Sequence, residues 1–175
     1  VASSWRTAEQ PNVVAALRKM GHEVYDCRDP PDGIKNGFRW SEIDPHWEKW
    51  TANQYRQKLP HPLAQQGFKS DFDGMKWADV CLLVLPCGRS AHLELGWCAG
   101  AGKRTIILTR DGQEPELMAL LADYICVTMA EVRALLNEPA RVEREPTPAE
   151  ASKIMPMGGL YECMTCGGDV RGCMC

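Results

Sequence analysis

The feature that most constrains the fold is an unbroken apolar run, "VCLLVLP", at residues 80–86. A strand with one face in water alternates apolar and polar residues, whereas a run that is apolar throughout is typical of a strand covered on both faces. Such strands belong to parallel sheets, because the helices that connect parallel strands cover both sides of the sheet. The run therefore predicts the centre of a parallel sheet.

Segments with strand and helix patterns alternate before and after this run. Including the run, we expect strands at residues 1–4, 22–27, 80–86, 104–109 and 124–128. Apolar residues at helical spacing predict helices at residues 11–21, 74–79, 90–102, 114–123 and 129–138. This alternation indicates an α/β fold with a doubly wound, five-stranded parallel sheet of the flavodoxin-like or Rossmann-like kind.

Two segments interrupt the alternation and divide the chain. Residues 28–60 are a long insertion, and loops of this length are usually functional, so we interpret it as a lid on a domain at residues 1–137. Residues 138–157 are rich in proline and charge and indicate a linker to a tail at residues 158–175. The insertion carries aromatic side chains that form either a ligand-facing lid or a satellite core under a loop, namely Phe38, Trp40, Trp47, Trp50 and Tyr55.

The composition excludes several classes of partner. The net charge of the 175 residues is −3, and without a basic excess we expect no long nucleic acid as a partner. No apolar segment is long enough to span a bilayer, so we expect no membrane partner. The odd total of 9 cysteines, most of them dispersed, argues against a secreted disulfide scaffold and favours a cytoplasmic protein. The chain starts without Met or a signal-peptide pattern, in what reads as the middle of a strand, so we expect a few residues before Val1.

The tail contains a cluster of cysteines, "CMTCGGDVRGCMC". A Cys-x-x-Cys pair is followed, after a polar turn with glycines, by a tighter Cys-x-Cys pair. Four thiolates can close a tetrahedral Zn²⁺ site of the structural kind. We therefore expect a zinc knuckle-like tail with a structural or partner-binding role, the alternative being a disordered or redox-labile tail; the ligands would be Cys163, Cys166, Cys173 and Cys175.

Polar residues gather where the expected strands end. In open α/β sheets, ligands bind outside the carboxyl ends of the strands. The turn from Gly88 to Ser90 follows the central strand and begins a helix, where free backbone N–H groups can bind an anion. Further candidates at strand ends, or just before the helix that leads into the central strand, are Ser4, Arg6, Asp26, Asp71, Asp73, Arg89 and Glu94.

Glu94 is the most unusual of these candidates. Its neighbours in the sequence include Leu93 and Leu95, which make a poor place for a solvated charge, and it follows Ser90 by four residues rather than the three of a capping box. A carboxylate beside an anion site, backed by a second one such as Asp71, suits sugar chemistry. One acid attacks the sugar or stabilises its positive charge, and the other exchanges a proton with the leaving group.

Each candidate also has a plainer interpretation. Glu94 is then a half-exposed helix residue, and Asp71 is the N-cap of the helix that follows it. Ser4 and Arg6 then cap the first helix, and His92 packs or forms a hydrogen bond near the start of its own helix.

Taken together, these residues resemble the nucleoside 2-deoxyribosyltransferase superfamily, which includes the 2′-deoxynucleoside 5′-phosphate N-hydrolases. The resemblance covers about residues 1–137 and rests on "ASSWR", "SDFDGMKWADVCLLVLP" and "GRSAHLELGWCAGAGKRTIIL". An ordered set carries it: an Asp, an Ala-Asp before an apolar strand, a Glu-aliphatic-Gly, and a Gly-Lys before the next strand. The insertion at residues 28–60 is longer than in the best-known members of the superfamily.

The resemblance implies roles for individual residues. Glu94 matches the glutamate that attacks the anomeric carbon and forms a glycosyl-enzyme ester. Asp71 matches the aspartate that helps protonate the departing base, and Ser4 and Arg6 match residues that hold the 5′-phosphate in the nucleotide-hydrolysing branch. A tyrosine that assists the nucleophile in relatives would fall just before Val1.

Other parts of the expected site match more loosely. Arg89 and Ser90 lie in the turn that corresponds to the sugar and phosphate side of the family's site. Stacking of a nucleobase on an aromatic side chain contributes about 1–3 kcal/mol. The insertion offers Trp40, Trp47 and Trp50 for such stacking.

The function implied by the resemblance is cleavage or transfer of the N-glycosidic bond of a deoxynucleoside, nucleoside or nucleotide, with no cofactor for catalysis. Members of the superfamily assemble as dimers or larger, so we expect a homodimer or a higher homo-oligomer. Two alternatives stay open. One is an NAD-cleaving enzyme of the Toll/interleukin-receptor type, which uses a comparable sheet and a glutamate on a helix. The other is a non-catalytic nucleotide-binding sensor with a zinc-bound interaction tail.

Overall fold

The computed structural model describes residues 1–4, 6–31 and 37–138. The chain divides into two compact units, Val1–Pro139 and Ala140–Cys175, and the fold below is that of the first. The expected zinc ligands Cys163, Cys166, Cys173 and Cys175 lie outside the described residues, as does nearly all of the expected linker at 138–157.

A parallel sheet forms the centre of the first unit, which confirms the predicted α/β class. The strands are β1 (Val80–Val84), β2 (Arg104–Leu108) and β3 (Tyr124–Cys126). Their order is β1-β2-β3, and all neighbours are parallel. The described residues thus form three strands, and the prediction of five is wrong.

The two missing strands correspond to residues 1–4 and 22–27. Ala2 forms one isolated parallel bridge with Leu83, in which its N–H donates to the Leu82 carbonyl and its carbonyl accepts from Val84, both at 2.9 Å. Next to it, the Tyr25 carbonyl accepts a hydrogen bond from the amino group of Val1 at 3.3 Å. A strand needs a ladder of consecutive pairs, and one bridge does not make one. Hydrogen bonds nevertheless link Ala2 to β1 and Tyr25 to Val1.

Three predicted helices are confirmed, and each of their ends lies within two residues of its predicted position. They are α1 (Gln10–Lys19), α4 (Arg89–Gly100) and α5 (Met129–Asn137). The segment expected as a helix at 114–123 forms only a short 3-10 helix, η3 (Leu117–Leu121). Leu117 and Leu120 on it are largely exposed, so it lacks the buried apolar stripe that stabilises a full α-helix.

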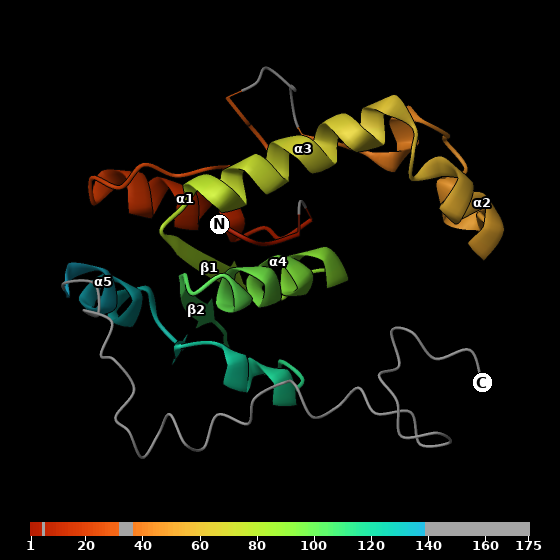
Figure 1. Ribbon diagram of the computed structural model, residues 1–175. Helices are drawn as coiled ribbons and strands as arrows, with labels where there is room; N and C mark the ends of the chain where they lie inside the picture. Colours follow the sequence, from red (N-terminus) through yellow and green to blue (C-terminus); the bar gives the residue numbers. More distant parts are fainter. Residues whose placement is uncertain (5, 32–36, 139–175) are drawn as a thin grey trace, which may run out of the picture. The chain divides into compact units, whose positions relative to one another are not determined.

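The helix before β1 is much longer than the predicted 74–79. This helix, α3, runs over Pro62–Trp77, because Pro62 occupies its first turn and the His61 side chain accepts a hydrogen bond from the Leu63 N–H. Asp71 and Asp73 therefore lie inside a helix rather than before one, and an N-cap role for Asp71 is wrong. Figure 1 shows α3 reaching from β1 out towards α2.

The insertion contains its own short helices, where sequence patterns indicated only a long loop. They are η1 (Trp40–Glu42), η2 (Trp47–Lys49) and α2 (Ala52–Lys58). α2 begins with a capping box, in which Thr51 and Gln54 each bond the other's backbone N–H. This local capping stabilises a seven-residue helix that has no buried residue.

The core has two faces because successive side chains of β1 point to opposite sides of the sheet. Cys81 and Leu83 pack with Leu95 and Cys98 of α4. Leu82 and Val84 pack on the other side, against Val13 and Leu17 of α1 and Val132 of α5. Helices thus cover both faces, as the apolar run predicted (Figure 1). No helix in the described ranges combines the length and the apolar character needed to cross a membrane.

Candidate active site

A cavity of about 290 Å³ brings Asp71 and Glu94 together. Asp71 comes from α3 and Glu94 from the second turn of α4, and Tyr25 and Cys27 line the same cavity from the extended segment beside Val1. Glu23 and Asp79 also line it but are exposed. The two residues expected to carry the chemistry therefore share one cavity.

The surroundings of Glu94 disfavour its charged form. Burial raises the pKa of this carboxyl, and the negative charge of Asp71 raises it further, to about 7. The positive amino group of Val1 acts in the opposite direction with a smaller effect. A carboxyl with a pKa near neutrality changes its charge with small changes in its surroundings, which is typical of general acids and bases.

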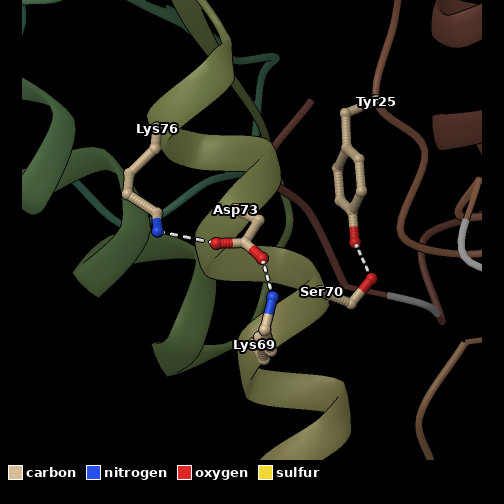
Figure 2. Close-up of polar contacts among 5 residues, drawn as sticks. All are labelled: Tyr25, Lys69, Ser70, Asp73 and Lys76. Atoms are coloured by element: carbon tan, nitrogen blue, oxygen red, sulfur yellow. Dashed lines mark hydrogen bonds and ion pairs between the residues drawn. The ribbon is translucent and has the colours of Figure 1, made fainter.

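Asp71 is held by a tyrosine that sequence reasoning missed. The Tyr25 hydroxyl donates to Asp71 Oδ1 at 2.9 Å and forms a second hydrogen bond with Ser70 Oγ at 2.8 Å. Figure 2 shows the Tyr25 ring reaching Ser70 on α3. The signal for Tyr25 was its place at the end of the expected strand 22–27, next to Asp26, which the sequence did single out.

Asp73, two residues further along α3, has a different environment. Its carboxylate pairs with Lys69 one turn before it and with Lys76 Nζ at 2.6 Å (Figure 2). Hydrogen bonds from Lys69 and Lys76 lower the Asp73 pKa to about 2. Asp73 is thus a surface ion-pair residue, although its residue type and position in the sequence resemble those of Asp71.

The structure places Ser4 and Arg6 in a turn. Ser4 Oγ accepts from the Arg6 N–H at 3.2 Å, and the Ser4 carbonyl accepts from the Thr7 N–H at 2.9 Å. The Arg6 guanidinium lies 4.0 Å from Glu48 and 5.9 Å from the ring centre of Trp47. Two expected binding residues, Arg6 and Trp47, thus meet each other at the insertion.

The start of α4 is open to solvent. Gly88 is the N-cap residue, and Gly88, Arg89 and Ser90 are all exposed. His92 lies one turn further, with Nδ1 3.1 Å from the Gly88 carbonyl oxygen. Among the residues that the structure describes, the cavity lining does not include the expected binding residues Ser4, Arg6, Trp40, Trp47, Gly88, Arg89 and Ser90.

Trp40 belongs to a small aromatic cluster in the insertion. Its ring packs edge-on against Phe38, Trp50 and Tyr55, with ring centres 4.8, 5.6 and 5.9 Å away. The Trp50 indole N–H donates to Asp44 Oδ2 at 2.7 Å. This packing favours the satellite-core interpretation for Trp40 over a role in base stacking.

A buried polar network ties together the loops at the carboxyl ends of the sheet. Asp26 Oδ1 accepts from Gln10 Nε2 at 2.7 Å and from the Arg28 N–H at 3.0 Å. The Arg28 guanidinium donates to the Thr7 carbonyl at 2.7 Å, and the Thr7 hydroxyl donates to the Pro86 carbonyl at the same distance. Asp26 and Arg28 therefore hold the loops beside the cavity, and neither lines it.

The described residues contain no group of three or more His, Cys, Asp or Glu side chains that could hold a metal ion. No protein-family model matches the sequence, and no curated protein matches it.

Proposed function

We propose that this protein cleaves or transfers the N-glycosidic bond of a deoxynucleoside, nucleoside or nucleotide, with Glu94 as nucleophile and Asp71 as proton donor to the base. The observation that supports the proposal is that both carboxyls line one cavity of about 290 Å³. Most enzymes that cleave glycosidic bonds use two carboxyls that share a site and differ in environment.

In the proposed reaction, a Glu94 carboxylate oxygen forms a bond to C1′ of the sugar while the C1′–N bond breaks. The electron pair of that bond goes to the base nitrogen, and the Asp71 carboxyl delivers a proton to the base. Water or a second base then attacks C1′, loses its proton to Asp71 and releases Glu94 as a carboxylate. Hydrolysis and transfer differ only in this second acceptor.

The electrostatics of the pair favour a single negative charge on the two carboxyls. Burial raises the Glu94 pKa and the charge of Asp71 raises it further, so the pair resists carrying two negative charges. The reaction needs one proton on the pair, with Asp71 protonated and Glu94 ionised. Protonation of Asp71 removes one of the two causes that oppose ionisation of Glu94, its burial being the other.

The test is release of free base. The protein is incubated separately with deoxynucleosides, deoxynucleoside 5′-monophosphates and NAD, and products are followed by chromatography. We expect base release from one of the first two classes, its loss in Glu94→Gln and Asp71→Asn, and its retention in Asp73→Asn, the matched acid on the outer side of α3. Nicotinamide release from NAD would favour the NAD-cleaving alternative. Nucleotide binding without turnover, unchanged in Glu94→Gln, would favour the sensor, and full turnover by that variant would exclude the proposal.

The remaining expectations belong to the same proposal. We propose that Cys163, Cys166, Cys173 and Cys175 bind one structural Zn²⁺ and that the protein is a cytoplasmic homo-oligomer. Elemental analysis of the purified protein, compared with a variant in which all four are Ser, tests the metal. Light scattering tests the oligomer. A zinc content equal in both proteins would contradict the tail site.

A further inference from the structure

We propose that Tyr25 is a positioning residue that holds the Asp71 carboxyl for proton transfer, and that Ser70 and Gly74 hold Tyr25. The proposal rests on the proposed function, because it assigns a role within the same reaction. Tyr25 and Asp71 line the cavity together with Glu94, although Tyr25 lies far from both in the sequence.

The direction of the hydrogen bonds follows from the number of protons. The Tyr25 hydroxyl has a single proton, and it donates this proton to Asp71 Oδ1 at 2.9 Å. The contact with Ser70 Oγ at 2.8 Å must then have Ser70 as the donor and the Tyr25 oxygen as the acceptor. The result is a directed chain from Ser70 through Tyr25 to Asp71.

The ring of Tyr25 is seated on α3 by a glycine. A Cβ atom added to Gly74 would lie 2.7 Å from Cγ and Cδ2 of Tyr25 and 2.8 Å from Cδ1. Real Cβ contacts are longer, so any other residue at this position would displace the ring. Ser70 and Gly74 are four residues apart and lie on one side of the helix, where they contact the hydroxyl and the ring of the same tyrosine.

The donated hydrogen bond acts most strongly when the base leaves. At that moment Asp71 loses its proton and becomes a carboxylate, and a hydrogen bond to an ionised acceptor is stronger than one to a neutral acid. The bond from Tyr25 therefore stabilises the transition state more than the bound substrate, which raises kcat rather than lowering KM. It also fixes the direction in which the carboxyl points.

The test compares the proposed reaction in the wild-type protein and in Tyr25→Phe, which keeps the ring and removes the hydroxyl. We expect kcat to fall about 10-fold or more, with KM within about twofold, because one hydrogen bond to a charged group is lost. Tyr124→Phe, in β3, is the matched control and should keep its kcat.

The pH profile separates positioning from a merely structural role. Loss of the donated hydrogen bond favours the protonated form of Asp71. The limb of the kcat–pH profile that follows the titration of Asp71 should therefore move to higher pH. The charged or titratable residues that line the cavity with Asp71 are Val1, with its amino group, His22, Glu23, Tyr25, Cys27, Asp79, Cys81, Glu94 and Cys98. All but Tyr25 stay in place in Tyr25→Phe, so the shift reports on the lost hydroxyl.

Two further variants test the contacts of Ser70 and Gly74 with Tyr25. Ser70→Ala should lower kcat less than Tyr25→Phe, because it removes a bond to Tyr25 and none to Asp71. Gly74→Ala should lower kcat at least as much as Tyr25→Phe, since the ring must shift. A wild-type kcat and pH profile in Tyr25→Phe, with turnover lost in Asp71→Asn, would overturn this inference alone. No base release by the wild-type protein would overturn the proposed function and this inference together.

Discussion

The two sides of α3 put the same residue type to different uses. On the cavity side Asp71 and Gly74 line the cavity and Ser70 contacts Tyr25, whereas the outer side presents Lys69, Asp73 and Lys76. On the cavity side a tyrosine hydroxyl holds the acid close to a second, half-buried acid. On the outer side two lysines neutralise the acid in water, and the Asp73 pKa falls to about 2.

The comparison teaches that the partners of a carboxylate, more than its place in a motif, decide what it can do. Asp71 and Asp73 are two residues apart in "SDFDG" and read alike in the sequence. Because a helix turns by about 100° per residue, two positions are enough to move a side chain towards the other side. Variants on the two sides of α3 test this difference.

The largest expected effect is on turnover. Asp71→Asn should reduce the rate of base release by about 100-fold or more, the range expected for loss of a general acid, whereas Asp73→Asn should change it by less than about twofold. Initial rates at saturating substrate measure both. Equal losses in the two variants would mean that the sides of α3 do not differ in function.

The next effect is the pH dependence of stability caused by Glu94. Its pKa is raised in the folded protein from 4.5 to about 7, so folding favours the protonated form. The stabilisation is complete below about pH 4.5 and is lost as the pH rises through about 7, a change of roughly 3 kcal/mol in the free energy of unfolding.

Glu94→Gln removes this titration. The free energy of unfolding of the variant minus that of the wild type should become more positive as the pH rises from 5 to 8. Urea unfolding at the two pH values measures it. A difference that stays constant would contradict the raised pKa.

A smaller effect is expected at the other end of α3. A Cβ atom added to Gly67 would lie 2.6 Å from Phe38 Cβ, so Gly67→Ala should disturb the contact between α3 and the insertion. Crowding of this kind costs about 1–3 kcal/mol. Because the cavity lies elsewhere on α3, turnover at a permissive temperature should persist. Thermal unfolding and activity of the same preparation check both statements, and a loss of turnover without a loss of stability would assign the insertion a direct role.

The smallest effect concerns the ion pairs of the outer side. Asp73→Asn should lower the melting temperature slightly at low salt and not measurably at high salt, because exposed pairs are weak and are screened by ions. Thermal unfolding at two salt concentrations tests this. A large loss that persists in high salt would show that the outer side is more than a solvated surface.

Local patterns were sufficient to predict much of the fold. The run around Leu82 and Leu83 reflects burial on both faces, and the structure places these neighbours in opposite halves of the core. The helices α1, α4 and α5 were predicted for the same reason, since an apolar face at helical spacing depends on nearby residues only. The failed helix at 114–123 had the same apolar content, but its leucines Leu117, Leu120 and Leu121 are exposed.

For the site, the sequence pointed to Glu94 and Asp71 but not to the residues around them. The resemblance named both acids, while the position of Tyr25 against Ser70 and Gly74 depends on how an extended segment packs on α3. No short-range pattern encodes such a contact. Likewise, the helical setting of Asp71 followed from the cap at His61 and Pro62, ten positions upstream.

The sequence by itself determined which segments are apolar on both faces, on one face or on neither, and therefore the α/β class and most helix positions. The tertiary structure alone decided how many strands form a ladder and which aspartate, Asp71 or Asp73, shares a cavity with Glu94. It also decided which tyrosine donates a hydrogen bond to Asp71. The physical reason is range: periodicity is a property of neighbours in the chain, whereas strand pairing and the pKa of a buried acid depend on groups that only folding brings within hydrogen-bonding distance.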